Sequence, residues 1–192
     1  RFVAGSMGPT TKTISVTGGI TFDDLATSYY EQALGLIEGG VDVLLLETGQ
    51  DVINVKAGLD GIDRAIAELN IEVAVAVQGT IEIMGTLLAG QDAEAFYTSL
   101  SHRNLLWLGF NCATGPEFMT DHIRTLASIS HFPVSCVPNA GLPDEDGNYN
   151  ESPEMIASTI GRFVESGWVN VVGGCCGTVP EHIRELSVMV NG

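Results

Sequence analysis

Two adjacent cysteines, Cys175 and Cys176, follow a short apolar run and lie among the glycines Gly173, Gly174 and Gly177. Neighbouring cysteines do not readily form a disulfide with each other, because a planar trans peptide does not offer the required Cα separation and dihedral angle. Two thiolates at the end of one strand can instead face the same soft divalent metal ion if a third ligand comes from elsewhere. The glycines would allow positive φ angles and the close approach of a cofactor or substrate.

The candidate third ligand is Cys112, which ends the apolar run Leu106–Cys112. Three thiolates suit zinc and leave its fourth tetrahedral position open, which is typical of catalysis more than of structure. No C-x-x-C or H-x-x-x-H pair of a zinc finger is present. The alternative is that these cysteines are small core hydrophobes. The surrounding glycines argue against that alternative for Cys175 and Cys176, whereas for Cys112 both interpretations stay open.

Two further polar residues stand at strand ends. Glu47 closes the apolar run Val43–Leu46, where an unpaired carboxylate would be costly to bury. We therefore expect a cationic partner or a ligand ammonium beside it, or else a structural hydrogen bond to a neighbouring loop. Asn139 follows Pro138 and is either a side-chain oxygen close to the metal or a turn former.

The remaining candidates are interpreted as structural. Cys136 lies in the middle of a strand and is expected to fill the core. The acidic stretch Pro143–Asn148 lacks the twelfth-position Glu and the flanking helices of a calcium loop, so we expect a solvated loop. The histidines fall in helices or in the turns after helices, so we expect surface residues and not metal ligands. They are His102, His122, His131 and His182.

The composition excludes several classes of partner. The chain has 192 residues, with 8 Lys and Arg against 24 Asp and Glu, and a formal net charge of -16. Nucleic acid and an anionic membrane surface would be repelled, and no apolar run approaches the roughly 20 residues that cross a bilayer. A chain of this length needs no disulfide staples, so we expect reduced cysteines and a cytoplasmic location.

Apolar runs alternate with helical patterns at a stride of roughly 30 residues, which is typical of βα units in a parallel sheet. Strands are expected at Phe2–Gly5, Val41–Glu47, Val73–Gly79, Leu106–Cys112, Val134–Asn139 and Val169–Gly174. Helices are expected from Thr21 to Gly39, from Val52 to Leu69 with Asn70 as a left-handed terminator, after Asp92, Pro116 and Pro153, and after a capping box of Thr178 and Glu181.

Such α/β repeats fit an open doubly wound sheet or a closed (β/α)8 TIM barrel. No G-x-G-x-x-G turn follows a strand, which weakens the dinucleotide-binding version of the open sheet. Polar residues stand at nearly every carboxyl end of a strand, and barrel enzymes place their chemistry at that rim. The six units fall short of eight. We therefore expect residues 1–192 to be one partial domain, an N-terminally truncated TIM barrel that covers about strands 3 to 8.

Over essentially its whole length the chain resembles the homocysteine S-methyltransferase family, which comprises zinc (β/α) barrels. The motifs that carry the resemblance are Gly5–Pro9, Glu47–Thr48, Gly109–Cys112, Pro138–Gly141 and Gly173–Thr178. Two more stretches, Ile20–Asp23 and Gly85–Tyr97, are most similar to the homocysteine-binding module of cobalamin-dependent methionine synthase. The first two strands of the family, with an Asp-Gly-x-Met-Gly-Thr turn, have no counterpart here.

The resemblance implies specific roles for residues. The zinc ligands that it implies are Cys112, Cys175 and Cys176. Glu47 would take the ammonium of homocysteine, and the backbone amides of the Gly5-Ser6-Met7 turn would lie near the substrate carboxylate. In this family the fourth zinc position takes the homocysteine sulfur, and in substrate-free methionine synthase it takes an asparagine that matches Asn139.

The implied activity is methyl transfer to homocysteine, which gives methionine. A free thiol has a pKa of about 8.5, and zinc binding deprotonates it, so the metal would generate the nucleophile. The resemblance places methylcobalamin, the methyl donor, on another domain of the same larger protein, which would also carry a methyltetrahydrofolate domain. No cobalamin-binding Asp-x-His-x-x-Gly signature occurs in this chain. Two alternatives remain, a cobalamin-independent methyltransferase that uses S-methylmethionine or betaine, and a non-catalytic zinc or thiol protein.

Overall fold

The computed structural model describes all 192 residues, which form six strands and six helices in strict alternation. The strands are β1 (Ala4–Met7), β2 (Val43–Gly49), β3 (Ala74–Gly79), β4 (Leu108–Asn111), β5 (Val134–Val137) and β6 (Val171–Val172). The helices are α1 (Phe22–Glu38), α2 (Val52–Leu69), α3 (Ala93–Leu100), α4 (Pro116–Ile129), α5 (Pro153–Glu165) and α6 (Pro180–Asn191). The α/β class expected from the sequence is confirmed.

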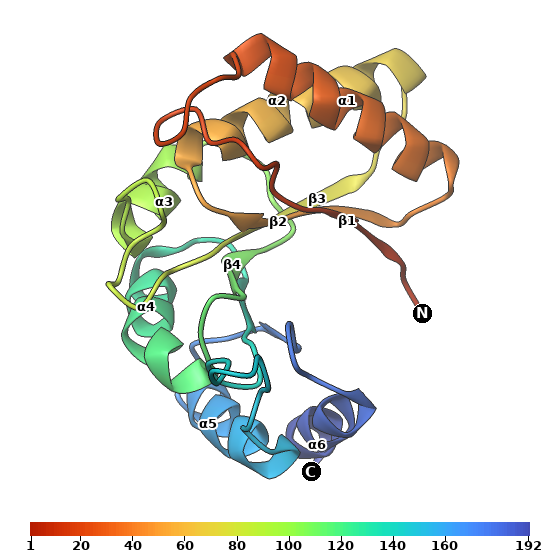
Figure 1. Cartoon of the computed structure of the whole chain (residues 1–192). Helices are drawn as coiled ribbons and strands as arrows, with labels where there is room; N and C mark the ends of the chain where they lie inside the picture. The colour runs from red at the N-terminus through yellow and green to blue at the C-terminus, as the bar shows by residue number, and fades with distance from the viewer.

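The six strands form one parallel sheet in chain order from β1 to β6. The sheet is curled, and the helices cover its outer, convex side, so that the whole has the shape of a half-barrel (Figure 1). β1 and β6 are the edges of the sheet, because each pairs with only one other strand. All strands run in the same direction, so their carboxyl ends lie along one rim.

The strands place alternate side chains on the two sides of the curved sheet. Leu44 and Leu46 of β2 and Phe110 of β4 are almost completely buried in the core between the sheet and the helices. Successive residues of a strand point to opposite sides. The neighbours Glu47 and Asn111 therefore face the concave side, at the carboxyl rim.

The helix boundaries follow local capping chemistry. The Thr21 side chain accepts a hydrogen bond from the Asp24 N–H at the start of α1, and Asn70 ends α2 in the left-handed conformation with φ 50°. Asp92 and Ser152 cap α3 and α5 in the same way as Thr21 caps α1. None of the six helices combines the length and the hydrophobicity that crossing a bilayer requires.

The predicted capping box of Thr178 and Glu181 is wrong. The Thr178 hydroxyl donates to the carbonyl oxygen of Cys175 at 2.7 Å, so α6 begins one residue later, with Val179 as its N-cap. His182 supplies the capping contact instead, because its Nδ1 accepts the N–H of Val179 at 3.1 Å. Thr178 thus belongs to the turn that carries the cysteines.

All six strands differ from their predicted bounds: β1 and β2 are shifted by two residues toward the C-terminus, β3, β4 and β5 are shorter, and β6 differs most in length. β1 covers Ala4–Met7 rather than Phe2–Gly5, because its residues pair with Val43–Leu46 of β2. The stretch Gly5-Ser6-Met7 is therefore part of a strand and not a turn. β6 contains only Val171 and Val172, which pair with β5, whereas the apolar run suggested six residues.

The contact between α1 and α2 requires glycine at position 61. A Cβ atom there would lie 2.4 Å from the carbonyl oxygen of Ala26 and 2.7 Å from the nitrogen of Tyr30, both in the backbone of α1. Gly35 of α1 is different, because nothing lies within 4 Å of its Cβ position. The two helices can approach this closely only because residue 61 has no side chain.

We expect Gly61→Ala to lower the free energy of unfolding by about 1–3 kcal/mol, because an added methyl group overpacks the helix contact. Gly35→Ala is the matched control, and it should raise the free energy of unfolding by up to about 1 kcal/mol, since alanine is the better helix former. Urea denaturation followed by circular dichroism measures both changes. Equal effects of the two substitutions would contradict the close helix contact.

Candidate metal centre

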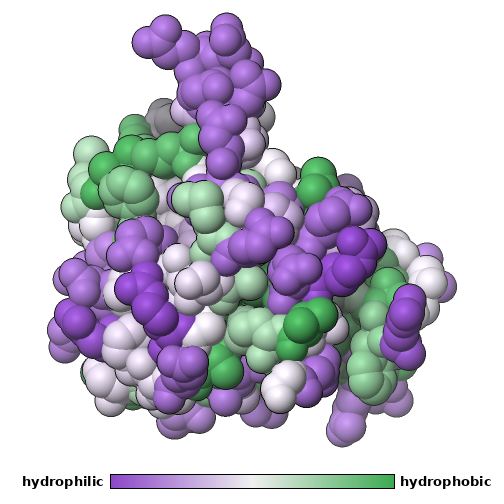
Figure 2. Space-filling view, turned by 90° about the horizontal axis from the view of Figure 1, so that it is seen from below, coloured by the Kyte–Doolittle hydropathy of each residue, from purple (hydrophilic) through white to green (hydrophobic).

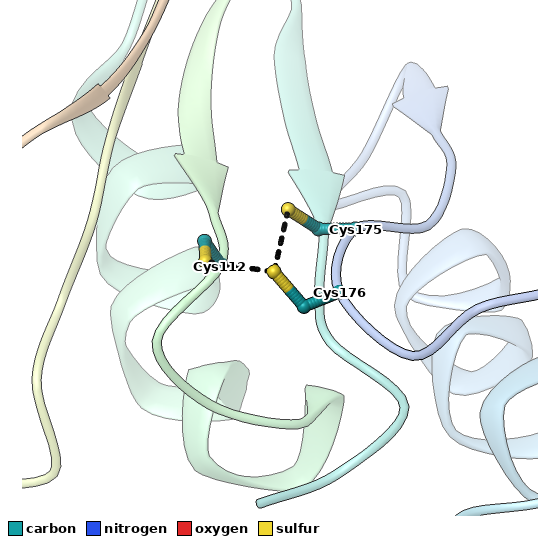
Figure 3. A group of neighbouring side chains, drawn as sticks. All are labelled: Cys112, Cys175 and Cys176. Atoms are coloured by element: carbon teal, nitrogen blue, oxygen red, sulfur yellow. Dashed lines mark hydrogen bonds between the residues drawn. The ribbon is translucent and has the colours of Figure 1, made fainter. Parts of the chain in front are cut away.

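Three thiols meet at the carboxyl rim of the sheet. Cys112 directly follows β4, while Cys175 and Cys176 lie in the turn after β6, and the side chains point toward one another (Figure 3). The Sγ atom of Cys176 lies 3.7 Å from that of Cys112 and 4.0 Å from that of Cys175. All three sulfur atoms lie within 4.8 Å of one another.

These distances fit a metal ion of the size of zinc. A tetrahedral zinc site with sulfur ligands at about 2.3 Å has sulfur atoms about 3.8 Å apart. The sulfur positions match that spacing without a large rearrangement. Cys112, Cys175 and Cys176 could therefore hold a metal ion. Three ligands leave room for a fourth from another source, which is the arrangement of catalytic zinc sites.

The loop after β5 joins the two cysteine segments, although β4 and β6 are not neighbours in the sheet. The N–H of Cys112 donates to the carbonyl oxygen of Val137 at 3.1 Å, and the N–H of Cys175 donates to that of Pro138 at 2.8 Å. On the other side, the N–H of Ala140 donates to the carbonyl oxygen of Cys176 at 2.9 Å. The backbone of residues 137–140 thus fixes all three cysteines.

The backbone beside the thiols is in the left-handed conformation, which determines the direction of the Cys112 side chain. Cys112 and Ala113 have φ angles of 63° and 58°, a region that residues other than glycine seldom adopt. Gly177 has φ 76°, and a Cβ atom there would lie 2.2 Å from the ring of Tyr149. Glycine at 177 therefore lets the Tyr149 ring lie against the cysteine turn.

Asn139 lies within this arrangement, as the sequence suggested, but its oxygen has a protein partner. Its side chain is only 3% exposed, and its Oδ1 accepts the backbone N–H of Cys176 at 3.0 Å. Its own N–H donates to the carbonyl oxygen of Thr114 at 3.0 Å. Asn139 therefore ties the Cys176 turn to the segment that follows Cys112.

The thiols differ in pKa because they lie close together and are partly buried. The nearby Cys175 thiol, with smaller contributions from the Ala113 N–H, Cys176 and Asn139, lowers the pKa of Cys112 to about 5. The same contact raises the pKa of Cys175, and burial together with the neighbouring Cys112 raises that of Cys176. Without a metal, one thiolate at Cys112 is thus stabilised by two protonated neighbours.

A carboxylate lies near the thiols on the same rim. Glu47 is half-buried, and its Oε1 accepts the Ser6 hydroxyl at 2.5 Å while its Oε2 accepts the Asn111 Nδ2 at 2.9 Å. None of the six ion pairs of the chain includes Glu47. Two neutral donors therefore orient the carboxylate and leave its charge uncompensated, which suits a cationic ligand group.

Asn111 is the residue that sequence reasoning missed. The prediction includes it only within the strand Leu106–Cys112, yet it is fully buried and contacts both Glu47 and Cys175. A polar residue at the end of an apolar strand, directly before a candidate metal ligand, was the available clue.

Other candidates of the sequence have structural places. Cys136 is fully buried, as predicted, and burial raises the pKa of its thiol to about 12. The prediction of surface histidines is wrong for His182, which is 5% exposed because it caps α6 and contacts the Glu151 carbonyl oxygen. Asp144 organises the acidic loop by accepting hydrogen bonds from Asp146 and Asn148.

The rest of the surface offers no comparable group of reactive side chains. A cavity of about 570 Å³ lies at the amino ends of the strands and is lined mostly by apolar residues, among them Phe2, Ala4 and Trp107. On the face shown in Figure 2, hydrophobic residues lie in separate groups among hydrophilic ones. The carboxyl rim is therefore the candidate site for chemistry.

Parallel βα units with three clustered thiols at the carboxyl rim define a class of α/β proteins that could hold a metal ion through cysteines. Within this class the sequence matches the model of the homocysteine S-methyltransferase family over residues 1–190. The chain belongs to the homocysteine S-methyltransferase family.

The fold is similar to that of solved structures. The apo form of the homocysteine methyltransferase MmuM from Escherichia coli matches with a TM-score of 0.75 and 19% identity, over 98% of this chain and 62% of that chain. Its metallated form matches with a TM-score of 0.73 and 19% identity, over 97% and 60%. An isomerase from Streptomyces coelicolor A3(2) matches with a TM-score of 0.53 and 14% identity, over 98% and 51%.

The chain thus spans about 60% of the length of the MmuM structures. At these identities the similarity shows the fold, a curled half-barrel consistent with part of a TIM barrel.

We expect the chain to bind a single zinc ion and Cys175→Ser to lose it, because two thiolates and a hydroxyl are a poor zinc site. Metal analysis of the purified protein by mass spectrometry measures the zinc content. Cys136→Ala is the control, since Cys136 lies in the core and should leave the zinc content unchanged. Full zinc retention in Cys175→Ser would overturn the assignment.

In the metal-free protein, Cys112 should react first with iodoacetamide near neutral pH, because its lowered pKa keeps it ionised at any pH above about 5. Its reaction should slow only as the pH falls toward that value, whereas an ordinary thiol already slows below about 8.5. Peptide mass spectrometry identifies the modified residue. Cys136, with a pKa of about 12, should stay unmodified in the folded protein. Faster labelling of Cys175 than of Cys112 would contradict this order.

Proposed function

We propose that this chain is a zinc-dependent homocysteine S-methyltransferase domain that binds homocysteine and activates its thiol for methyl transfer, giving methionine. Membership of the family supports the reaction class. The observation that carries the proposal is the shared rim: Asn111 contacts both Glu47, a carboxylate without a cationic partner, and Cys175, one of the three clustered thiols. An α-amino acid with a terminal thiol has the two matching groups, an ammonium and a sulfur.

Different residues of the chain would bind the substrate and the metal ion. Glu47 binds the substrate ammonium, and Ser6 contributes by orienting the Glu47 carboxylate rather than through a turn of backbone amides. Cys112, Cys175 and Cys176 hold the zinc ion. When bound, zinc deprotonates a thiol and keeps the sulfur nucleophilic at neutral pH.

Asn139 holds the Cys176 turn through its Oδ1. To act as a fourth metal ligand in the substrate-free protein, Asn139 would have to break the hydrogen bond between its Oδ1 and the Cys176 N–H and bind the metal through that oxygen instead. We retain this role as part of the proposal, because Asn139 is buried beside the thiols.

The methyl transfer needs a donor that approaches from the open side of the rim. The substrate sulfur forms the new bond to the methyl carbon, and the bond between methyl and donor breaks with its electron pair left on the donor. We propose methylcobalamin on another domain as the donor, with a methyltetrahydrofolate domain in the same larger protein. The sequence similarity of Ile20–Asp23 and Gly85–Tyr97 to cobalamin-dependent methionine synthase supports this choice.

We further propose that residues 1–192 act as one domain within an eight-unit (β/α)8 barrel. The six parallel units and the match to 62% of the longer MmuM chain support this architecture. A reducing compartment such as the cytoplasm is proposed because all four cysteines are free thiols in the structure.

The test of the proposal is whether homocysteine adds a sulfur neighbour to the bound zinc, measured by X-ray absorption at the zinc edge. We expect Glu47→Gln to weaken homocysteine binding by about 10- to 100-fold, since a hydrogen bond to a charged group contributes about 1.5–3 kcal/mol. The zinc content should not change, because the candidate metal ligands are the three cysteine thiols and Glu47 is not one of them. An unchanged zinc spectrum with homocysteine would count against the function.

The methyl donor is tested by activity. Methionine formation should be measured with methylcobalamin, S-methylmethionine and betaine as separate donors. Turnover with a small donor alone would favour the cobalamin-independent alternative. Zinc binding without homocysteine binding would favour a non-catalytic zinc protein.

A further inference from the structure

The strongest unassigned feature is the side chain of Asn111, which connects the candidate ammonium site to the candidate metal site. We propose that Asn111 is a positioning residue that holds Glu47 at a fixed distance from the thiols, so that the ammonium and the sulfur of one ligand are recognised together. This inference rests on the proposed function and adds a role for a residue outside its set of ligands.

The hydrogen bonds of Asn111 determine how its amide is oriented. Its Oδ1 accepts the backbone N–H of Thr48 at 2.8 Å. A backbone N–H can only donate, so the oxygen must face Thr48 and the Nδ2 must face the other way. The Nδ2 then lies 2.9 Å from Glu47 Oε2, 2.8 Å from Thr48 Oγ1 and 3.8 Å from Cys175 Sγ.

Burial makes this orientation rigid. Asn111 is 0% exposed, so no solvent competes for its amide. Its backbone is also fixed, because Asn111 pairs with Val137 in the sheet. One rigid side chain therefore contacts the carboxylate and one of the thiols at the same time.

The conformation of Thr48 depends on the same amide. Thr48 has φ 57°, which is a genuine outlier for a β-branched residue. Both its N–H and its hydroxyl are bonded to Asn111. Because Thr48 directly follows Glu47, loss of the Asn111 amide should release the backbone that carries the Glu47 carboxylate.

The chemical consequence is coupled recognition. Glu47 alone would attract any ammonium, and the thiols with their metal would bind any thiol. With the separation fixed by Asn111, a ligand that carries both groups at the right spacing gains from both contacts. A ligand with the thiol alone gains only one.

The experiment measures this coupling in the zinc-loaded full chain with two probes. The first probe is homocysteine, and the second is 4-mercaptobutyrate, which has the same thiol, chain and carboxylate but no ammonium. Calorimetry gives both affinities for the wild type, Asn111→Ala and Asn111→Ser, and metal analysis gives the zinc content. Ser6→Ala is a comparison variant that removes a donor to Glu47 without touching the cysteines.

In the wild type we expect homocysteine to bind at least about 10-fold more tightly than 4-mercaptobutyrate. In the Asn111 variants we expect this affinity ratio to approach one. The loss of homocysteine affinity should then be about 10- to 100-fold, as for other residues that support metal sites. The affinity for 4-mercaptobutyrate and the zinc content should stay unchanged.

Other outcomes would overturn the inference. Equal weakening of both probes, or no change in either, means that Asn111 does not couple the two sites. Loss of zinc or of folding in both Asn111 variants assigns the residue a structural role instead. If the wild type binds no homocysteine at all, the proposed function fails, which is a distinguishable result.

Discussion

The candidate site depends on the backbone of residues 137–140, which joins two strands that do not touch. β5 lies between β4 and β6, so the three thiols can meet only if the chain that leaves β5 does not fill the space between them. The backbone of residues 137–140 leaves that space free and forms hydrogen bonds on both sides, to Cys112 and to Cys175 and Cys176. Backbone N–H and carbonyl groups at the strand ends, which have no partner in the sheet, thereby form hydrogen bonds within the rim.

The electrostatics of the rim follow from this geometry. Three thiols and a carboxylate lie together in a chain whose net charge is already -16. Neutral donors, Ser6 and Asn111, hold Glu47, and the thiols mainly hydrogen-bond one another. Negative charge is thus gathered without cationic side chains to balance it, so a divalent cation and an ammonium are the groups that would stabilise the site.

Much of the fold could be predicted from the sequence where local chemistry decides. The helix Val52–Leu69 and its terminator Asn70 were predicted at their observed boundaries, because capping involves residues only a few positions apart. The alternation of strands and helices predicted the shared rim. The positions of β1 and β2 were each wrong by two residues, since they are set by pairing between strands about 40 residues apart along the chain.

The site was predictable in its residue types but not in its connections. The thiols of Cys112, Cys175 and Cys176 lie together as the prediction required. The contacts of Asn111 could not be predicted, because its partners Thr48 and Cys175 lie 63 and 64 positions away along the chain. His182 was misplaced because a helical histidine can cap its own helix, which the pattern of apolar residues does not reveal.

The left-handed residues Thr48, Cys112 and Ala113 have a consequence for the lifetime of the protein. Each such conformation costs about 1–3 kcal/mol, and a whole domain is stable by only about 5–15 kcal/mol. An ion that binds the thiols only in the folded state offsets part of that cost by mass action. The supply of metal in the cell would then govern how long the folded chain persists before degradation, as well as whether it can react.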